Sequence, residues 1–98
     1  MDIVLNVNKK DLIETISSKF GNSSHIIISK SQIGKKVKII TGDSKLIGNR
    51  LHIPIFNSEI LERTISSFGT GAHVILPKEY SDKKIKLILE GENSQLDN

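Results

Sequence analysis

One segment of the chain occurs twice. "FGNSSHIIISK" at 20–30 returns as "FGTGAHVILPK" at 68–78, which places the two copies 48 positions apart. The same offset aligns "KKVKII" at 35–40 with "KKIKLI" at 83–88, so the repeat covers most of the 98 residues. A unit of this size is at the lower limit of what folds alone, and the chain has no cysteine to staple it. Two such units can bury a joint core around a pseudo-twofold axis, as the subunits of a homodimer do.

The repeat defines the expected domain organisation. We expect a single domain, 1–98, made of repeat one at 1–48, repeat two at 49–90 and a polar tail at 91–98. "ETISSKF" at 14–20 and "RTISSF" at 63–68 agree best when one residue is slipped, which indicates a small insertion or bulge there.

The pattern within each repeat is that of β-strands. "DIVLNVN" at 2–8 alternates apolar and polar residues, whereas "HIII" at 25–28 and "HVIL" at 73–76 are continuous and predict strands buried on both faces. "GNSS" and "GTGA" supply the turn residues of a hairpin. Four stretches have room for a short helical turn, namely "KKDLIE", "SKSQIG", "NSEILE" and "PKEYSD". The sequence therefore predicts an all-β dominated fold with short helical turns.

Charge and composition favour a protein with a basic surface and argue against a membrane-spanning or secreted one. The net charge is +3, and residues 1–48 hold eight lysines against four acids, so repeat one is the better candidate for a surface that faces a polyanion. No apolar run approaches the roughly 20 residues that cross a bilayer, and no basic leader precedes an apolar core. With no cysteine, we expect a cytoplasmic protein that does not act at a membrane.

The hairpin segment resembles a known family. "KFGNSSHIIISKSQIGKKVKII" and "FGTGAHVILPKEYSDKKIKLIL" are similar to the AbrB/MazE-like swapped-hairpin family, in which Gly-Asn-Ser, an apolar run, Pro-Lys and a basic-apolar strand follow one another. The resemblance covers about 13–41 and 61–89 and is nearest to the short archaeal transposon-associated type. It implies a pseudo-twofold swapped-hairpin barrel built from two tandem AbrB-like repeats in one chain.

The resemblance also implies a function and its site. Members of the family mostly bind double-stranded DNA as transcription regulators or as antitoxins, through the hairpin around Gly-Asn-Ser. We therefore expect DNA contacts at the hairpins and on the Lys-rich face of repeat one: Lys19, Asn22, Ser23, Ser24, His25, Lys30, Lys35, Lys36, Thr70, Gly71, His73 and Lys78. Lysines would meet phosphates, while the Gly-Asn-Ser turn would sit at the groove.

One alternative to DNA binding and the oligomeric state stay open. MazE-like members often carry an arginine in the apolar run, where this chain has Ile27 and Ile75. The chain therefore offers few arginines that could recognise guanine through two hydrogen bonds. A protein-interaction module, antitoxin-like or bound to a host factor or toxin, would keep the fold without DNA binding. The chain could be a monomeric pseudo-dimer, or it could form a homodimer through 51–55 or the strand of His25.

Enzymatic activity is not expected. The "TISS" segments offer serines, but no base or orienting acid follows at a motif-like spacing. His25 and His73 recur as a pair without the further ligands that a structural metal site needs, so we expect neither a metal nor a cofactor.

Overall fold

The computed structural model describes residues 2–90, and the expected tail at 91–98 lies outside them. Eleven strands run through this part of the chain: β1 (Asp2–Asn6), β2 (Leu12–Ile16), β3 (Ser18–Phe20), β4 (Ser23–Ile28), β5 (Lys36–Gly42), β6 (Lys45–Ile47), β7 (Arg50–Pro54), β8 (Ser58–Thr64), β9 (Ser66–Phe68), β10 (Gly71–Leu76) and β11 (Lys84–Leu89). Four single-turn 3-10 helices join them: η1 (Lys9–Asp11), η2 (Lys30–Gln32), η3 (Ile55–Asn57) and η4 (Lys78–Tyr80). The prediction of an all-β fold with short helical turns is confirmed.

Three of the four expected helical turns form within their predicted stretches, and the fourth, expected in "NSEILE", forms just before it. The turns at η1 and η3 end at Asp11 and Asn57, and the rest of "KKDLIE" and "NSEILE" belongs to β2 and β8. Their strand conformation is stabilised by ladders to distant strands, which outweigh the weak local preference for a helical turn.

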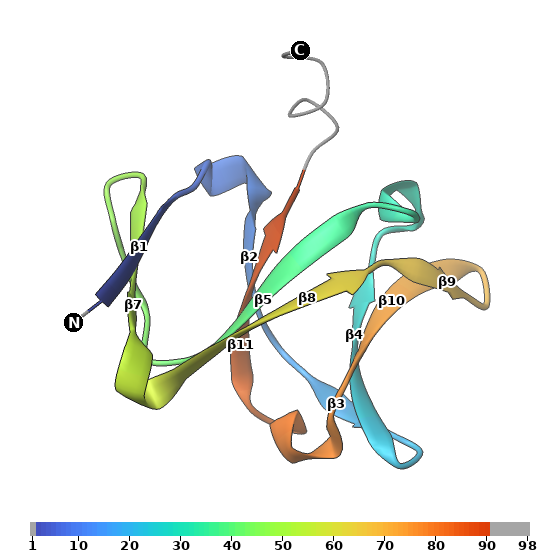
Figure 1. The fold of residues 1–98 in the computed structure, drawn as a ribbon. Coiled ribbons are helices and arrows are strands. Elements are labelled where there is room, and N and C mark those ends of the chain that lie inside the picture. The colour runs from blue at the N-terminus through green and yellow to red at the C-terminus, as the bar shows by residue number, and fades with distance from the viewer. Residues whose placement is uncertain (1, 91–98) are drawn as a thin grey trace.

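The strands form three antiparallel sheets that lie side by side (Figure 1). The first has the order β1-β7-β6, the middle one β2-β11-β5-β8 and the third β3-β4-β10-β9. β2 continues into β3 after Ser17, and β8 continues into β9 after Ile65, so two bent strands connect the middle and third sheets.

The two repeats are related by a pseudo-twofold axis. In three strand pairs a residue lies opposite its own counterpart 48 positions later: Val4 opposite His52, Ile26 opposite Val74, and Ile39 opposite Leu87. The repeats also exchange strands, because β2 of repeat one pairs with β11, and β8 of repeat two pairs with β5. Neither half therefore contains a complete sheet of its own.

The expected one-residue slip near residue 65 is wrong. Ser17 donates its amide to Lys83 and accepts from the Asp82 amide, while Ile65 makes the same two bonds to Lys35 and Gly34. All these partners differ by 48, so the backbone register runs on without an insertion. The copies differ only in their side chains, and Ile16 is 58% exposed whereas Ile65 is buried.

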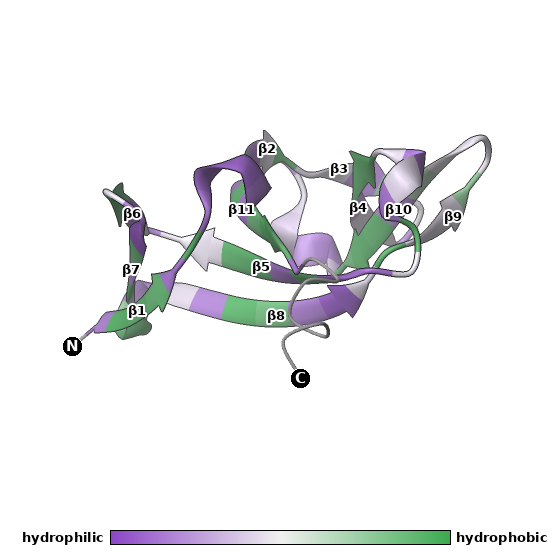
Figure 2. Cartoon of the chain, turned by 90° about the horizontal axis from the view of Figure 1, so that it is seen from above, coloured by the Kyte–Doolittle hydropathy of each residue, from purple (hydrophilic) through white to green (hydrophobic). Residues whose placement is uncertain are grey.

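Apolar side chains fill the spaces on both faces of the middle sheet. In Figure 2, where the ribbon is coloured by hydropathy, green apolar stretches lie along its strands. Val37, Ile39, Ile85 and Leu87 face the third sheet, where they meet Ile26 and Val74. Ile40, with Ile60 and Ile88 beside it, faces the first sheet and packs against Val7, Leu51 and Ile53. Each fully buried aliphatic side chain contributes about 1.5–3 kcal/mol.

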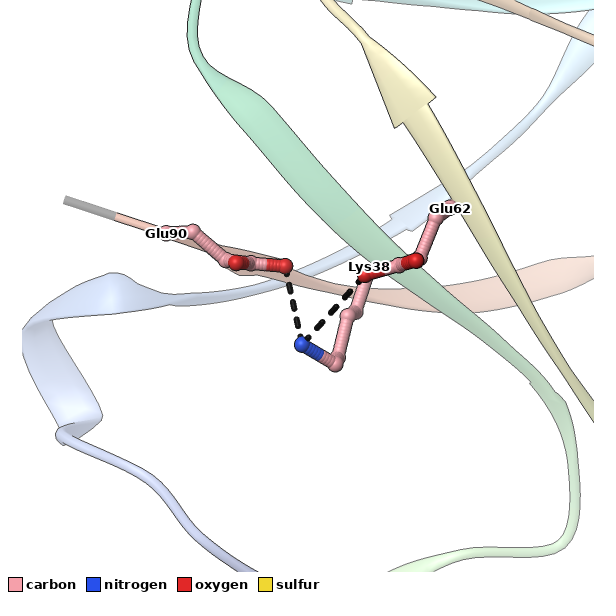
Figure 3. A network of polar contacts seen from close by, with 3 residues as sticks. All are labelled: Lys38, Glu62 and Glu90. Atoms are coloured by element: carbon pink, nitrogen blue, oxygen red, sulfur yellow. Dashed lines mark hydrogen bonds and ion pairs between the residues drawn. The ribbon is translucent and has the colours of Figure 1, made fainter. Parts of the chain in front are cut away.

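Cross-strand ion pairs recur with the repeat. Lys38 on β5 lies 2.8 Å from Glu90 and 3.6 Å from Glu62, which is its neighbour on β8 (Figure 3). The hydrogen bond to Glu90, followed by the charges of both carboxylates, raises the pKa of Lys38. The counterpart Lys86 faces Glu14 at 3.9 Å and donates to the carbonyl of Ser44, since Gly42 occupies the position equivalent to Glu90.

Gly42 is required by the close approach of η3. It has a φ of +87°, and a Cβ there would lie 1.8 Å from the carbonyl oxygen of Asn57. Gly34 has nearly the same φ, +90°, but a Cβ there would meet nothing within 4 Å.

We expect Gly42→Ala to destabilise the fold more than Gly34→Ala. Both variants carry the left-handed backbone penalty of about 1–2 kcal/mol, and Gly42→Ala adds an overpacking cost of about 1–3 kcal/mol. Urea unfolding measures the stability of both variants, because a shift of the midpoint at an unchanged m-value reports a change in the free energy of unfolding. Equal midpoints for the two variants would show that the contact with Asn57 is not a constraint.

Candidate nucleic-acid interface

Each repeat presents one tight hairpin. In the first, Phe20 pairs with Ser23 across a Gly21-Asn22 turn, and in the second, Phe68 pairs with Gly71 across a Gly69-Thr70 turn. Gly21 and Gly69 both have a φ of +58°, which a type II′ turn needs at its first central position. Asn22 and Thr70 therefore lie exposed at equivalent tips.

The two tips lie at opposite ends of the third sheet. β4 and β10 are antiparallel, with Ser24 opposite Leu76 and Ala72 opposite Ile28. At about 3.3 Å per residue, the six residues of β4 separate the ends by roughly 20 Å. The end at Asn22 is called the first end below, and the end at Thr70 the second end.

Repeat two supplies much of the first end. The hydroxyl of Ser24 donates to the carbonyl of Pro77 at 2.9 Å, and the hydroxyl of Ser17 donates to the carbonyl of Tyr80. These bonds attach η4, with its exposed Lys78, to both arms of the first hairpin. Lys19 pairs with Ser24 and so lies on the side of the sheet that carries η4.

Arg63 joins the first end as well. Its Nε donates to the carbonyl of Ile75 at 3.2 Å, and it lines a shallow hollow together with Ser23 and Pro77. Sequence reasoning missed this residue because Arg63 is 40 positions from Ser23. The signal lay in the offset of 48: once repeat two is folded onto repeat one across the axis, β8 runs beside β10, whose end pairs with the start of β4.

The expected Lys-rich face of repeat one is divided between the two ends. β4 carries the chain away from its own hairpin, so η2 with Lys30, and then Lys35, lie against the second hairpin. The first end gathers Lys19, Asn22, Ser23, Arg63, Lys78, Lys83 and Lys84, whereas the second gathers Lys30, Lys35, Lys36, Thr70 and Gly71. Each end therefore mixes residues of both repeats.

The two ends differ little in charge. Lys19 and Arg63 at the first end stand where the second end has Ser67 and Thr15, but Glu79 and Asp82 stand where the second end has Ser31 and Gly34. The charge asymmetry between the two halves of the sequence thus does not become an asymmetry between the two ends.

The cations at these ends are available to a ligand. Among residues 2–90, the ion pairs use only Lys38 and Lys86 as cations. Lys19, Lys30, Lys36 and Lys78 are exposed, and Lys35 is half-buried. Ser24, by contrast, is fully buried and its hydroxyl is used by Pro77, which gives it a structural role.

His25 and His73 form a closed pair between the two ends. Their Nδ1 atoms lie 3.0 Å apart, and both rings are buried. Phe20 stacks on His25 with centroids 4.2 Å apart, and Phe68 stacks on His73 at 4.4 Å. The imidazoles thus face each other beneath the two phenylalanines.

The face that holds this pair is only partly covered. Ile27 and Ile75 flank the histidines and are 60% and 44% exposed, so the expectation that "HIII" and "HVIL" are buried on both faces is wrong at these positions. The reason is that no third layer covers the outer side of the third sheet among the described residues.

The histidine pair disfavours a second proton. One Nδ1 must donate and the other accept, so protonating both would place two donors face to face. Burial, and then the charge of His25, lowers the pKa of His73. Within residues 2–90, neither histidine is paired with a carboxylate, and its surroundings on β3 and β9 are phenylalanine and serine.

We expect stability to fall as the pH drops below about 6.5. The folded chain has a His73 pKa below the usual 6.5, so the unfolded chain takes up the proton first and is favoured at lower pH. The free energy of unfolding keeps its full value above the pKa that His73 has in the unfolded chain. It declines as the pH falls from there toward the lower pKa of the folded chain, by at most about 1.4 kcal/mol per pH unit for one proton.

Urea midpoints measured between about pH 7.5 and 5.5, above the range of ordinary carboxylates, check this. A His25→Phe/His73→Phe variant should lose the slope, whereas His52→Asn should keep it. A slope that survives in the double variant would assign the effect to other groups.

Comparison of the chain with models of protein families, with curated proteins and with solved structures finds no significant match. Within residues 2–90, no three histidine, cysteine or carboxylate side chains come together as a metal-binding group. No helix in the described part of the chain is long and apolar enough to cross a membrane.

Proposed function

We propose that this protein is a cytoplasmic double-stranded DNA-binding regulator of AbrB/MazE type. The observation that carries the proposal is the convergence of cations around each hairpin tip, from both repeats at the first tip and from repeat one at the second. Lys19 of repeat one and Arg63 and Lys78 of repeat two surround the first tip. Their positive charge is not used by the ion pairs of residues 2–90.

The chemistry of these side chains favours phosphate over base contacts. Lysine binds phosphate as a point charge, and each contact releases counterions from the duplex, which makes affinity strongly dependent on salt. Asn22, exposed at its tip, has an amide that can pair with adenine in a major groove. The proposal therefore assigns most of the affinity to cations and the readout of sequence to the hairpin tips.

The arrangement of the ends suits a duplex. Two tips roughly 20 Å apart on one sheet can meet the two phosphate backbones that border one major groove. Because each end mixes both repeats, we assign DNA contact to both ends and not to the hairpin of repeat one alone. The pseudo-twofold axis then matches the local twofold symmetry of the duplex backbone.

We expect Lys19→Ala/Arg63→Ala/Lys78→Ala to weaken DNA binding on the order of 100-fold at about 0.1 M salt, with a salt slope reduced by about 3. Fluorescence anisotropy on a duplex of about 25 base pairs at several salt concentrations measures both quantities. A second triple variant, Lys30→Ala/Lys35→Ala/Lys36→Ala, should give a similar loss of DNA affinity because it removes the lysines of the second end.

The matched control is Lys9→Ala/Lys10→Ala/Lys45→Ala. It removes three exposed lysines from η1 and β6, outside the two ends, and should leave the slope nearly unchanged. An equal loss for all three variants would reduce the binding to net charge and contradict the assigned interface.

A protein-interaction module is the second candidate, favoured by the exposed Ile27 and Ile75 beside the histidine pair. An apolar interface there would be nearly insensitive to salt, whereas binding through several phosphates weakens steeply as salt rises. The salt series above distinguishes the two.

A further inference from the structure

The pseudo-twofold axis leaves one strand position unmatched. β6 pairs with the outer edge of β7, from Lys45 opposite His52 to Ile47 opposite Arg50. β1 is the counterpart of β7, yet among residues 2–90 it pairs only with β7 and keeps its other edge free. The first sheet thus has three strands where the symmetry of the other two sheets would give four.

Segment 45–49, which comprises β6 and its turn, covers apolar residues on the β7 side. Leu46 lies opposite Leu51, which is fully buried. Leu46 is itself partly buried and packs against the apolar cluster that contains Leu51.

The counterpart of Leu51 is exposed along the β1 edge. Ile3, which occupies this position, is 39% exposed, and Ile55 and Phe56, which follow β7, are 44% and 88% exposed. Where β6 covers Leu51, the other side shows these three apolar residues and a strand edge that has no partner among residues 2–90.

The edge also lacks the usual protection. Natural edge strands carry lysines, prolines or bulges that prevent pairing with another chain. β1 reads Asp-Ile-Val-Leu-Asn and has no lysine or proline. Within residues 2–90, nothing therefore prevents its outer edge from pairing with an added strand.

We propose that the free edge of β1 docks an extended segment of a partner protein as a fourth, antiparallel strand. The segment would have the chemistry of β6, with a leucine-like side chain opposite Ile3 and a second aliphatic residue beside it. Added strands of this kind gain affinity from main-chain hydrogen bonds and specificity from alternate side chains. The exposed Ile55 and Phe56 would cover the end of the segment.

Two other occupants fit the edge less well. Residues 93–95, which follow β6 by 48 positions, are Asn-Ser-Gln and offer no aliphatic side chain in the place of Leu46. A second copy paired through β1 would contact this chain through a strand of only five residues. A stable interface between two proteins buries roughly 800 Å² per partner and uses about 20–30 residues on each side. Five residues suit a short linear segment.

The test uses the full-length protein and a peptide of residues 44–49, Ser-Lys-Leu-Ile-Gly-Asn, followed by amide NMR shifts. We expect saturable shifts at 3–5 and 55–56. Replacing the peptide leucine by serine should weaken binding at least tenfold, because it removes the aliphatic side chain that would pack against Ile3.

The protein variants keep the test specific to this edge. Ile3→Ser should abolish the shifts, whereas Ile27→Ser, at an isoleucine still more exposed but on the third sheet, should preserve them. Absence of shifts at β1, or shifts at β6 and β7 instead, would overturn the proposal.

Two further outcomes would overturn the choice of occupant. Protection of the β1 amides that grows with protein concentration would assign the edge to a second copy. Peptide binding only to a chain ended after Glu90 would assign it to residues 91–98. DNA affinity is measured separately, since failure of this docking leaves the proposed function untouched.

Discussion

The exchange of β2 and β8 between the repeats is the constraint on which the rest of the structure depends. Because β2 pairs with β11 and β8 with β5, the middle sheet exists only when both repeats contribute to it. Both apolar clusters are built on that sheet, one on each face. The same exchange places the helical turn of each repeat against the hairpin of the other, so that each end combines residues of both repeats.

The duplication within one chain has allowed equivalent positions to take different tasks. Ser17 and Ile65 occupy the same bend, but one bonds η4 through its hydroxyl and the other fills the core. Glu90 completes the ion-pair network of Lys38, whereas Gly42 in the equivalent position admits the backbone of η3. Tyr80 enters the core and bonds Glu59, which raises the pKa of its hydroxyl to about 12, while its counterpart is Gln32. A dimer of identical chains could not make such choices separately.

Much of the fold could be read from the offset of 48, since strand periodicity and turn residues recur at the same spacing in both copies. The sequence wrongly predicts a slip near Ile65, because the identical residues "TIS" at 15–17 and 64–66 align at an offset of 49. The backbone hydrogen bonds of this region keep the offset of 48. The candidate site was harder to predict. Local sequence places Lys30, Lys35 and Lys36 beside Asn22, but β4 carries them to the far end of the sheet, and Arg63 arrives from the other repeat. His25 and His73 were visible as a pair, but their mutual hydrogen bond and the phenylalanines above them depend on the β4–β10 register.

The β2–β11 ladder has a consequence for how the chain reaches this state. β2 ends at Ile16 and meets its partner only at Lys84, so its hydrogen bonds close a loop of most of the domain. Contacts of such sequence separation slow folding, because the entropy of loop closure is lost before the contact is gained. During synthesis, β2 and the apolar face beside it must wait until β11 has left the ribosome. Chaperone binding in that interval, and the rate of translation through the second repeat, therefore bear on the yield of this fold more than on its final stability.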